Sequence, residues 1–111
     1  MDVNPDVALD FKSAKGRQIL EQLVAESDVF VENYIPGKLS EYGMGWDDLK
    51  SINPKLVYAS LTGWGQTGAL AQRAGYDVII ASYGGLLSIT GEADGPPARV
   101  GMVYVESLSF I

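Results

Sequence analysis

The chain has 111 residues, and its eight Lys and Arg against fourteen Asp and Glu give a formal net charge of −6. A chain of this length predicts a single domain, which hides roughly two-thirds of the surface that the unfolded chain exposes. The negative charge repels phosphate backbones and anionic lipid headgroups, so the sequence argues against nucleic-acid binding and membrane association. With 47% hydrophobic and 20% charged residues, the composition is that of a globular protein.

The sequence contains no cysteine and no histidine. This excludes disulfides, thiolate nucleophiles, imidazole bases and the commonest zinc ligands, so we expect no metal site and any chemistry must use carboxylates, hydroxyls or amines. No secretory or mitochondrial signal is visible in the first residues, and the longest apolar region, residues 78–87, is far shorter than the roughly twenty residues of a membrane span. We therefore expect a soluble, cytoplasmic protein.

The first half of the chain predicts strands and helices in alternation. Residues 7–11 alternate in polarity like a short strand, and Lys12-Ser13 is a possible helix cap. Residues 14–26 carry apolar side chains at the spacing of one helical face. Residues 28–32 are β-rich, and Pro36-Gly37 stops them with a pair that suits the centre of a type II turn.

The middle of the chain continues this alternation. Residues 38–42 and 46–52 are short helical candidates, and Asp47 and Asp48 are placed where a helix start favours negative charge. Residues 56–61 form an apolar run typical of a strand that is covered on both faces. The pattern indicates βα units and a parallel sheet.

The second half is punctuated by glycine. Residues 63–75 are predicted as loop, residues 76–90 as a buried helix that Gly84-Gly85 weakens, and residues 91–97 as loop. Three or four strands are too few for a covered parallel sheet, so we expect an α/β fragment of a larger fold. The apolar end, residues 102–111, suggests truncation or a covering partner.

Two loops follow the predicted strand ends, where open α/β sheets bind ligands. Asn33 and Tyr34 offer an amide and an aromatic ring next to a rigid turn, which suits an adenine-like group; a plain turn with Asn33 as a local cap is the alternative. Arg73 is the only basic residue between Lys55 and Arg99, so it would meet a phosphate or carboxylate, unless it is simply a solvated surface arginine.

Residues 63–68, Gly-Trp-Gly-Gln-Thr-Gly, satisfy the dinucleotide-binding pattern G-x-G-x-x-G. The surrounding sequence does not fit, because Gly75 interrupts the expected helix and no acidic residue lies about twenty positions on. Trp64 would also crowd an approaching pyrophosphate. A flexible loop that covers a substrate is the preferred interpretation, and dinucleotide binding is the lesser alternative.

Two acidic residues stand among apolar neighbours. Asp77 is either a partner in a helix N-cap or a buried acid that orients a neighbour. Glu106 is the one carboxylate side chain between Arg99 and the end; it could act as a nucleophile with a raised pKa, or be a strand-end glutamate that faces water.

A series of motifs follows in a fixed order along residues 7–101. It is made of the following segments: residues 7–10 with Gly16-Arg17, residues 28–37, residues 53–58, residues 63–68, residues 73–77, Thr90-Gly91 and residues 94–97. This series resembles the class III coenzyme A (CoA) transferases of the formyl-CoA and carnitine CoA-transferase type, and especially the succinyl-CoA–glutarate and formyl-CoA branch.

The resemblance implies a fragment of a Rossmann-like parallel-sheet large domain, with residues 1–111 forming part of it. Enzymes of this family are several-fold longer, form interlocked dimers, and move CoA between an acyl-CoA and a small carboxylic acid. They do so through an aspartate that becomes a mixed anhydride and then a CoA thioester. CoA and acyl-CoA are thus expected as substrates, with no tightly bound cofactor, and a homodimer is expected for the full-length form.

The same resemblance implies site residues. Asn33 and Tyr34 would line the CoA site beside adenosine, Arg73 would meet the CoA phosphates, and Tyr76 and Asp77 would belong to the same wall. Glu106 falls in the register of the catalytic aspartate. Because glutamate is longer by a methylene, roughly 1.5 Å, full activity is in question, and a non-catalytic CoA-binding or subunit-pairing remnant is the alternative.

Overall fold

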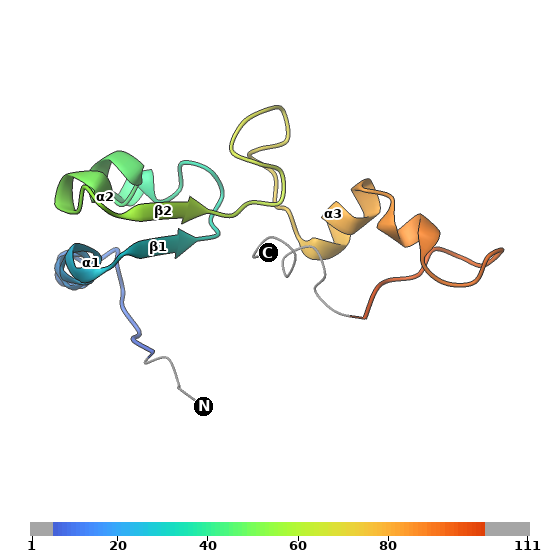
Figure 1. Cartoon of the computed structure of the whole chain (residues 1–111), viewed down its shortest axis with the longest axis horizontal. Coiled ribbons are helices and arrows are strands. Elements are labelled where there is room, and N and C mark those ends of the chain that lie inside the picture. Colours follow the sequence, from blue (N-terminus) through green and yellow to red (C-terminus); the bar gives the residue numbers. More distant parts are fainter. Residues whose placement is uncertain (1–5, 102–111) are drawn as a thin grey trace. The chain divides into compact units, whose positions relative to one another are not determined.

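The computed structural model describes residues 6–101. These residues form two compact units, one made of residues 6–32 and 37–59 and the other of residues 33–36 and 60–101. No helix among the described residues is long and apolar enough to cross a membrane. The regular elements are, in chain order, α1 (Ala14–Glu26), β1 (Val29–Glu32), η1 (Ser40–Tyr42), α2 (Trp46–Ile52), β2 (Val57–Ser60), α3 (Asp77–Tyr83) and η2 (Leu86–Ile89) (Figure 1).

Helix α1 spans the predicted residues and begins at the predicted cap. The Ser13 Oγ accepts a hydrogen bond of 3.1 Å from the backbone N–H of Gly16, so it satisfies one of the free donors of the first turn. The other end of α1 is held by Asn53, whose side-chain amide donates to the carbonyls of Val24 and Ser27 at 3.1 and 2.8 Å. This tie joins the end of α1 to the end of α2.

Strands β1 and β2 form a two-stranded sheet and point the same way, as Figure 1 shows. The backbone N–H of Val57 donates to the carbonyl of Asp28 at 2.9 Å. The chain passes from β1 to β2 through η1 and α2, which is the βα crossover that parallel strands require. The predicted α/β class with a parallel sheet is therefore confirmed.

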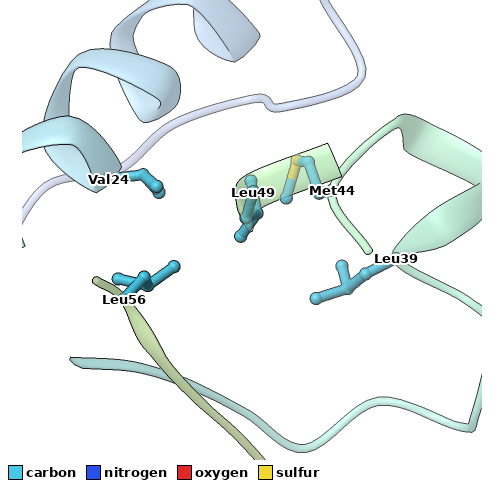
Figure 2. Close-up of a cluster of buried hydrophobic side chains, with 5 residues drawn as sticks. All are labelled: Val24, Leu39, Met44, Leu49 and Leu56. Atoms are coloured by element: carbon cyan, nitrogen blue, oxygen red, sulfur yellow. The ribbon is translucent and has the colours of Figure 1, made fainter. Parts of the chain in front are cut away.

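A small apolar core holds the first unit together. Its five buried side chains converge on one space (Figure 2), and they are Val24, Leu39, Met44, Leu49 and Leu56. Leu49 of α2 is fully buried. Phe30 of β1 and Tyr58 of β2 pack against this cluster from the sheet, so both strands contribute one face to it.

The first strand predicted from the sequence is wrong, because residues 7–11 form no strand. Val7 is exposed, and no neighbouring strand lies within the described residues to pair with this segment. Asp10 instead accepts hydrogen bonds from the backbone N–H groups of Lys12 and Ser13, both at 3.1 Å, so the chain turns directly into α1.

The expectation of a sheet covered on both faces is also wrong for the described residues. Val29 and Val31 of β1 are 53% exposed, and Val57 of β2 is 59% exposed. Side chains on a strand alternate between faces, so these valines lie opposite the residues that face the core. Residues 6–101 supply no element that buries them.

The predicted helix over residues 76–90 is divided. Helix α3 ends at Tyr83, and η2 follows after Gly84 and Gly85. Gly85 has φ of 81°, a left-handed conformation that interrupts a right-handed helix. Only Ala81 is buried in these two elements, so the predicted burial is wrong as well. Residues 91–97 form a loop as expected, closed by a 3.3 Å hydrogen bond from Ala98 N–H to the Thr90 carbonyl.

Candidate functional site

The candidate site lies in the second unit. All five predicted ligand-binding residues belong to it, and they form two groups that 38 residues of sequence separate: Asn33 and Tyr34 in the first, and Arg73, Tyr76 and Asp77 in the second. The first group follows the end of β1, and the second group ends a loop that follows β2. Both groups thus come after carboxyl ends of parallel strands, where α/β sheets bind their ligands.

The segment after β1 presents its side chains to solvent. Asn33 is exposed and the Tyr34 ring is 44% exposed, so an amide and an aromatic face are both accessible. The chain then turns at Pro36-Gly37, where Gly37 has the positive φ of 84° that a type II turn requires at its third position. An accessible ring next to a rigid turn is suited to stacking on a flat heterocycle.

The loop that carries Arg73 is closed on itself by a contact between two glycines. A Cβ added to Gly75 would lie 2.7 Å from the Cα of Gly63, a distance that real Cβ atoms do not adopt. The Trp64 indole N–H donates to the Ala74 carbonyl at 3.2 Å, and the Trp64 ring packs edge-on against Tyr83 of α3, with 5.0 Å between centroids. We call these contacts, made by Gly63, Trp64, Ala74, Gly75 and Tyr83, the loop clasp.

A hydrogen bond joins the two groups of candidate residues. The Gln72 side-chain amide donates to the Pro36 carbonyl at 3.1 Å, across 36 positions of sequence. Gln72 directly precedes Arg73, and Pro36 lies two residues after Tyr34. The structure therefore brings the backbone of the aromatic-amide segment, residues 33–36, beside the backbone that carries the cation.

Arg73 itself is exposed, and it forms no ion pair with another residue in the range 6–101. The other charged side chains that the structure describes in this unit are those of Asp77, Glu92, Asp94 and Arg99. An exposed guanidinium can form two parallel hydrogen bonds to a phosphate. The described geometry is therefore compatible with anion binding at Arg73.

Tyr76 and Asp77 stand at the beginning of α3. The Tyr76 ring is 68% exposed, and its backbone forms the N-cap without a side-chain cap hydrogen bond. Asp77 is the first residue of α3, directly after the N-cap residue Tyr76, and it is half-buried rather than fully buried. An acidic residue in the first turn is favoured by the helix dipole.

The pKa shifts that the structure shows belong to residues of the first unit. The ion pair with Glu41, at 2.6 Å, raises the pKa of the Lys38 amine. Partial burial, with a smaller contribution from Glu32, raises the pKa of the Tyr58 hydroxyl. Glu106, the predicted catalytic carboxylate, lies outside the described residues.

Sequence reasoning missed the groups that organise the site. It treated residues 63–75 as a flexible loop and assigned no role to Gln72, Trp64 or the Gly63–Gly75 contact. The dinucleotide interpretation loses support, because residues 63–68 open no helix and α3 begins only at Asp77.

Known proteins resemble nearly the whole chain. The sequence profile of CoA-transferase family III matches residues 5–109. A succinyl-CoA:glutarate CoA-transferase of Mus musculus is 48% identical over 100 residues, which are 90% of this chain and 23% of the mouse protein. An acyl-CoA transferase of Fusarium pseudograminearum is 46% identical over 100 residues, which are 90% of this chain and 22% of that protein.

Solved structures also resemble nearly the whole chain. A CAIB/BAIF family protein from Brucella suis superimposes with a TM-score of 0.84 at 45% identity, over 88% of this chain and 26% of that chain. A protein from Mycobacterium tuberculosis superimposes with a TM-score of 0.82 at 32% identity, over 93% of this chain and 29% of that chain. The chain thus spans about a quarter of the length of the curated relatives it matches. It belongs to CoA-transferase family III.

Proposed function

We propose that this chain serves CoA transfer between an acyl-CoA and a small carboxylic acid, and that its second unit binds the nucleotide part of CoA. The observation that carries the proposal is the placement of residues 33–36 and Arg73 in one unit, joined through the Gln72–Pro36 hydrogen bond. The relatives supply the chemistry, since several of them bear names of CoA-transferases that act on succinyl-CoA or formyl-CoA.

The CoA molecule fits the two groups of side chains. Its adenine offers a flat face for Tyr34 and polar edges for the Asn33 amide, and stacking of a base on an aromatic ring is worth about 1–3 kcal/mol. Its phosphates offer paired oxygens to the Arg73 guanidinium. Tyr76 and Asp77, which open α3 directly after this loop, form part of the same wall in our proposal.

The reacting carboxylate in this proposal is Glu106. Its attack on the acyl-CoA carbonyl breaks the C–S bond, releases CoA thiolate and forms a mixed anhydride. The thiolate then attacks the glutamyl carbonyl, which releases the acyl group as its carboxylate and leaves a glutamyl-CoA thioester. The second carboxylic acid reverses these steps and departs as the new acyl-CoA. Succinyl-CoA and glutarate are the substrates to try first, because the mouse and human relatives are named for them.

CoA binding is tested by isothermal titration of the 111-residue chain. We expect Arg73→Ala to weaken CoA binding about tenfold, which corresponds to about 1.4 kcal/mol. The matched control is Arg99→Ala, which removes an equal charge from an exposed residue of the same unit. This control is needed because the net charge of −6 already repels an anionic ligand. If both variants lose the same affinity for CoA, Arg73 contributes only through its general positive charge. If the original chain gives no heat of binding at millimolar CoA, the proposal is refuted.

Transfer is tested separately, with succinyl-CoA, glutarate and the Glu106→Gln variant. Turnover that depends on Glu106 supports the catalytic role, and turnover that Glu106→Gln leaves unchanged removes it. CoA binding without turnover favours the second candidate, a non-catalytic CoA-binding or subunit-pairing chain. That candidate rests on Glu106, which takes the register of the family's aspartate and is longer by one methylene.

We further propose that residues 1–111 are part of the large domain of a longer dimeric enzyme, and that the compartment is the cytoplasm. Sedimentation of the chain, alone and mixed with a full-length family member, measures self-association and subunit pairing. If the 111-residue chain sediments as a monomer both alone and beside the full-length protein, the pairing is contradicted.

A further inference from the structure

Arg73 lies between two residues whose positions are fixed by long-range contacts. On one side, Gln72 donates its side-chain amide to the Pro36 carbonyl at 3.1 Å. On the other side, the Ala74 carbonyl accepts from the Trp64 indole at 3.2 Å. The backbone N–H of Arg73 also donates to the Leu70 carbonyl at 2.8 Å. The backbone of an exposed cation is thus held in place on both sides.

The two contacts have different consequences. The Trp64 bond is part of the loop clasp and fixes residues 73–75 against residues 63–64, so it acts within one loop. The Gln72 bond reaches the segment that carries Asn33 and Tyr34, which belongs to this unit although it comes earlier in the sequence. Only a contact of the second kind fixes the distance between the aromatic-amide segment and the cation.

We propose that Gln72 is a positioning residue, which holds the aromatic-amide segment at the spacing from Arg73 that a phosphorylated nucleoside requires. This inference rests on the function proposed above and assigns a role to a residue that need not touch the ligand. Its side chain acts through the Pro36 carbonyl, two residues beyond Tyr34.

The physical basis is the gain from preorganising two subsites. A ligand that contacts both groups binds tightly when the groups already have the right spacing, since no chain entropy is lost in bringing them together. When the Gln72 bond is removed, residues 33–36 have to be ordered by the ligand itself. A ligand that contacts one group alone does not bear this cost.

This difference defines the expected result. We expect Gln72→Ala to weaken CoA binding about fivefold, the effect of losing about one hydrogen bond. Gln72→Met, which is similar in size, lacks the donor and adds no charge, should lose about as much. Binding of adenosine, which probes the aromatic-amide segment, and of inorganic diphosphate, which probes Arg73, should remain within about twofold of the original chain.

The loop offers a matched control. Gln66 is also exposed and also uses its side-chain amide, but it donates to the Ser60 hydroxyl at 2.7 Å, six positions away, and does not reach residues 33–36. Gln66→Ala removes the same kind of hydrogen bond from the same loop. It should leave the affinities for CoA, adenosine and diphosphate in their original ratio.

The experiment is a set of titrations of the ¹⁵N-labelled 111-residue chain, followed by amide chemical shifts. Before ligand is added, Gln72→Ala should shift the backbone amide signals of Tyr34, Ile35 and Gly37, and Gln66→Ala should not. If CoA binds the original chain and both Gln72 variants equally well, the positioning role is wrong and the proposed function stands. A loss that is the same for CoA, adenosine and diphosphate also overturns it, because it would reflect general loss of structure.

If the original chain does not bind CoA, the proposed function fails and the unliganded spectra decide the structural part alone. Changed chemical shifts at the backbone amides of Tyr34, Ile35 and Gly37 in Gln72→Ala then support the positioning role. Unchanged chemical shifts at these amides overturn it.

Discussion

The contact between Gly63 and Gly75 makes the sharpest prediction about the Arg73 loop. In Gly75→Ala the new Cβ would lie 2.7 Å from the Cα of Gly63, and the two segments must separate until this distance is at least 3.0 Å. The obstructing atoms are backbone, so no side-chain rotation relieves the overlap. The loop has to open, and Arg73, two residues away, moves with it.

The magnitude follows from the contacts that this opening disturbs. The Trp64–Ala74 hydrogen bond and the Trp64–Tyr83 ring contact are each worth about 1 kcal/mol. Replacing glycine by alanine also restricts the unfolded chain, which stabilises the folded state by about 0.5 kcal/mol. We therefore expect the free energy of unfolding of the second unit to fall by about 1.5 kcal/mol.

Urea unfolding followed by Trp64 fluorescence measures this change, in a Trp46→Phe background because Trp46 lies in the first unit. Gly63→Ala should give the same loss, since its Cβ would lie 2.7 Å from Gly75 Cα, and the double variant should lose less than the two single losses together. Gly101→Ala is the control, because its Cβ meets nothing within 4 Å. If Gly75→Ala unfolds like the original chain, with unchanged Trp64 emission, the clasp is refuted.

Three further predictions concern the first unit. Leu49→Ala, at the fully buried centre of the core, should lower the free energy of unfolding by about 3 kcal/mol, whereas Val57→Ala, on the exposed sheet face, should cost under about 1 kcal/mol in the same urea titration. Asn53→Ala leaves two carbonyls at the end of α1 without their donor and should cost about 2 kcal/mol, seen as a lower thermal midpoint; an unchanged midpoint would contradict this. Burial, and to a lesser extent Glu32, raises the pKa of Tyr58, so the folded state holds this proton to higher pH than the unfolded state. The contribution of Tyr58 to stability should therefore be constant below about pH 10 and decrease above it, and stability should fall less steeply above pH 10 in Tyr58→Phe.

Local signals in the sequence were enough to predict the first unit's helices. Ser13 and the apolar spacing predicted both ends of α1, and the acidic start of α2 is confirmed by the bond from Gly45 N–H to the Asp48 carboxylate at 3.0 Å. These signals depend on residues within one or two helical turns of each other. A strand at residues 7–11 failed because strand formation depends on a neighbour, which alternating polarity does not reveal.

In the candidate site, too, the sequence predicted what depends on single residues and did not predict what depends on contacts between distant segments. Residue types alone selected Asn33, Tyr34 and Arg73, since an amide and an aromatic ring suit an adenine base and an isolated cation suits a phosphate. Their arrangement depends on the loop clasp and on the Gln72–Pro36 bond, contacts between segments distant in sequence. Glycine, tryptophan and glutamine in a loop have many possible partners, so sequence alone could not identify these contacts.

The most direct test of a CoA site in the second unit is a measurement of intermolecular nuclear Overhauser effects in the CoA-saturated 111-residue chain. The account predicts effects from the adenine H2 and H8 protons to the Tyr34 ring, together with effects from ribose protons to the Arg73 side chain. A saturated complex in which the adenine protons contact only residues of the first unit would contradict it.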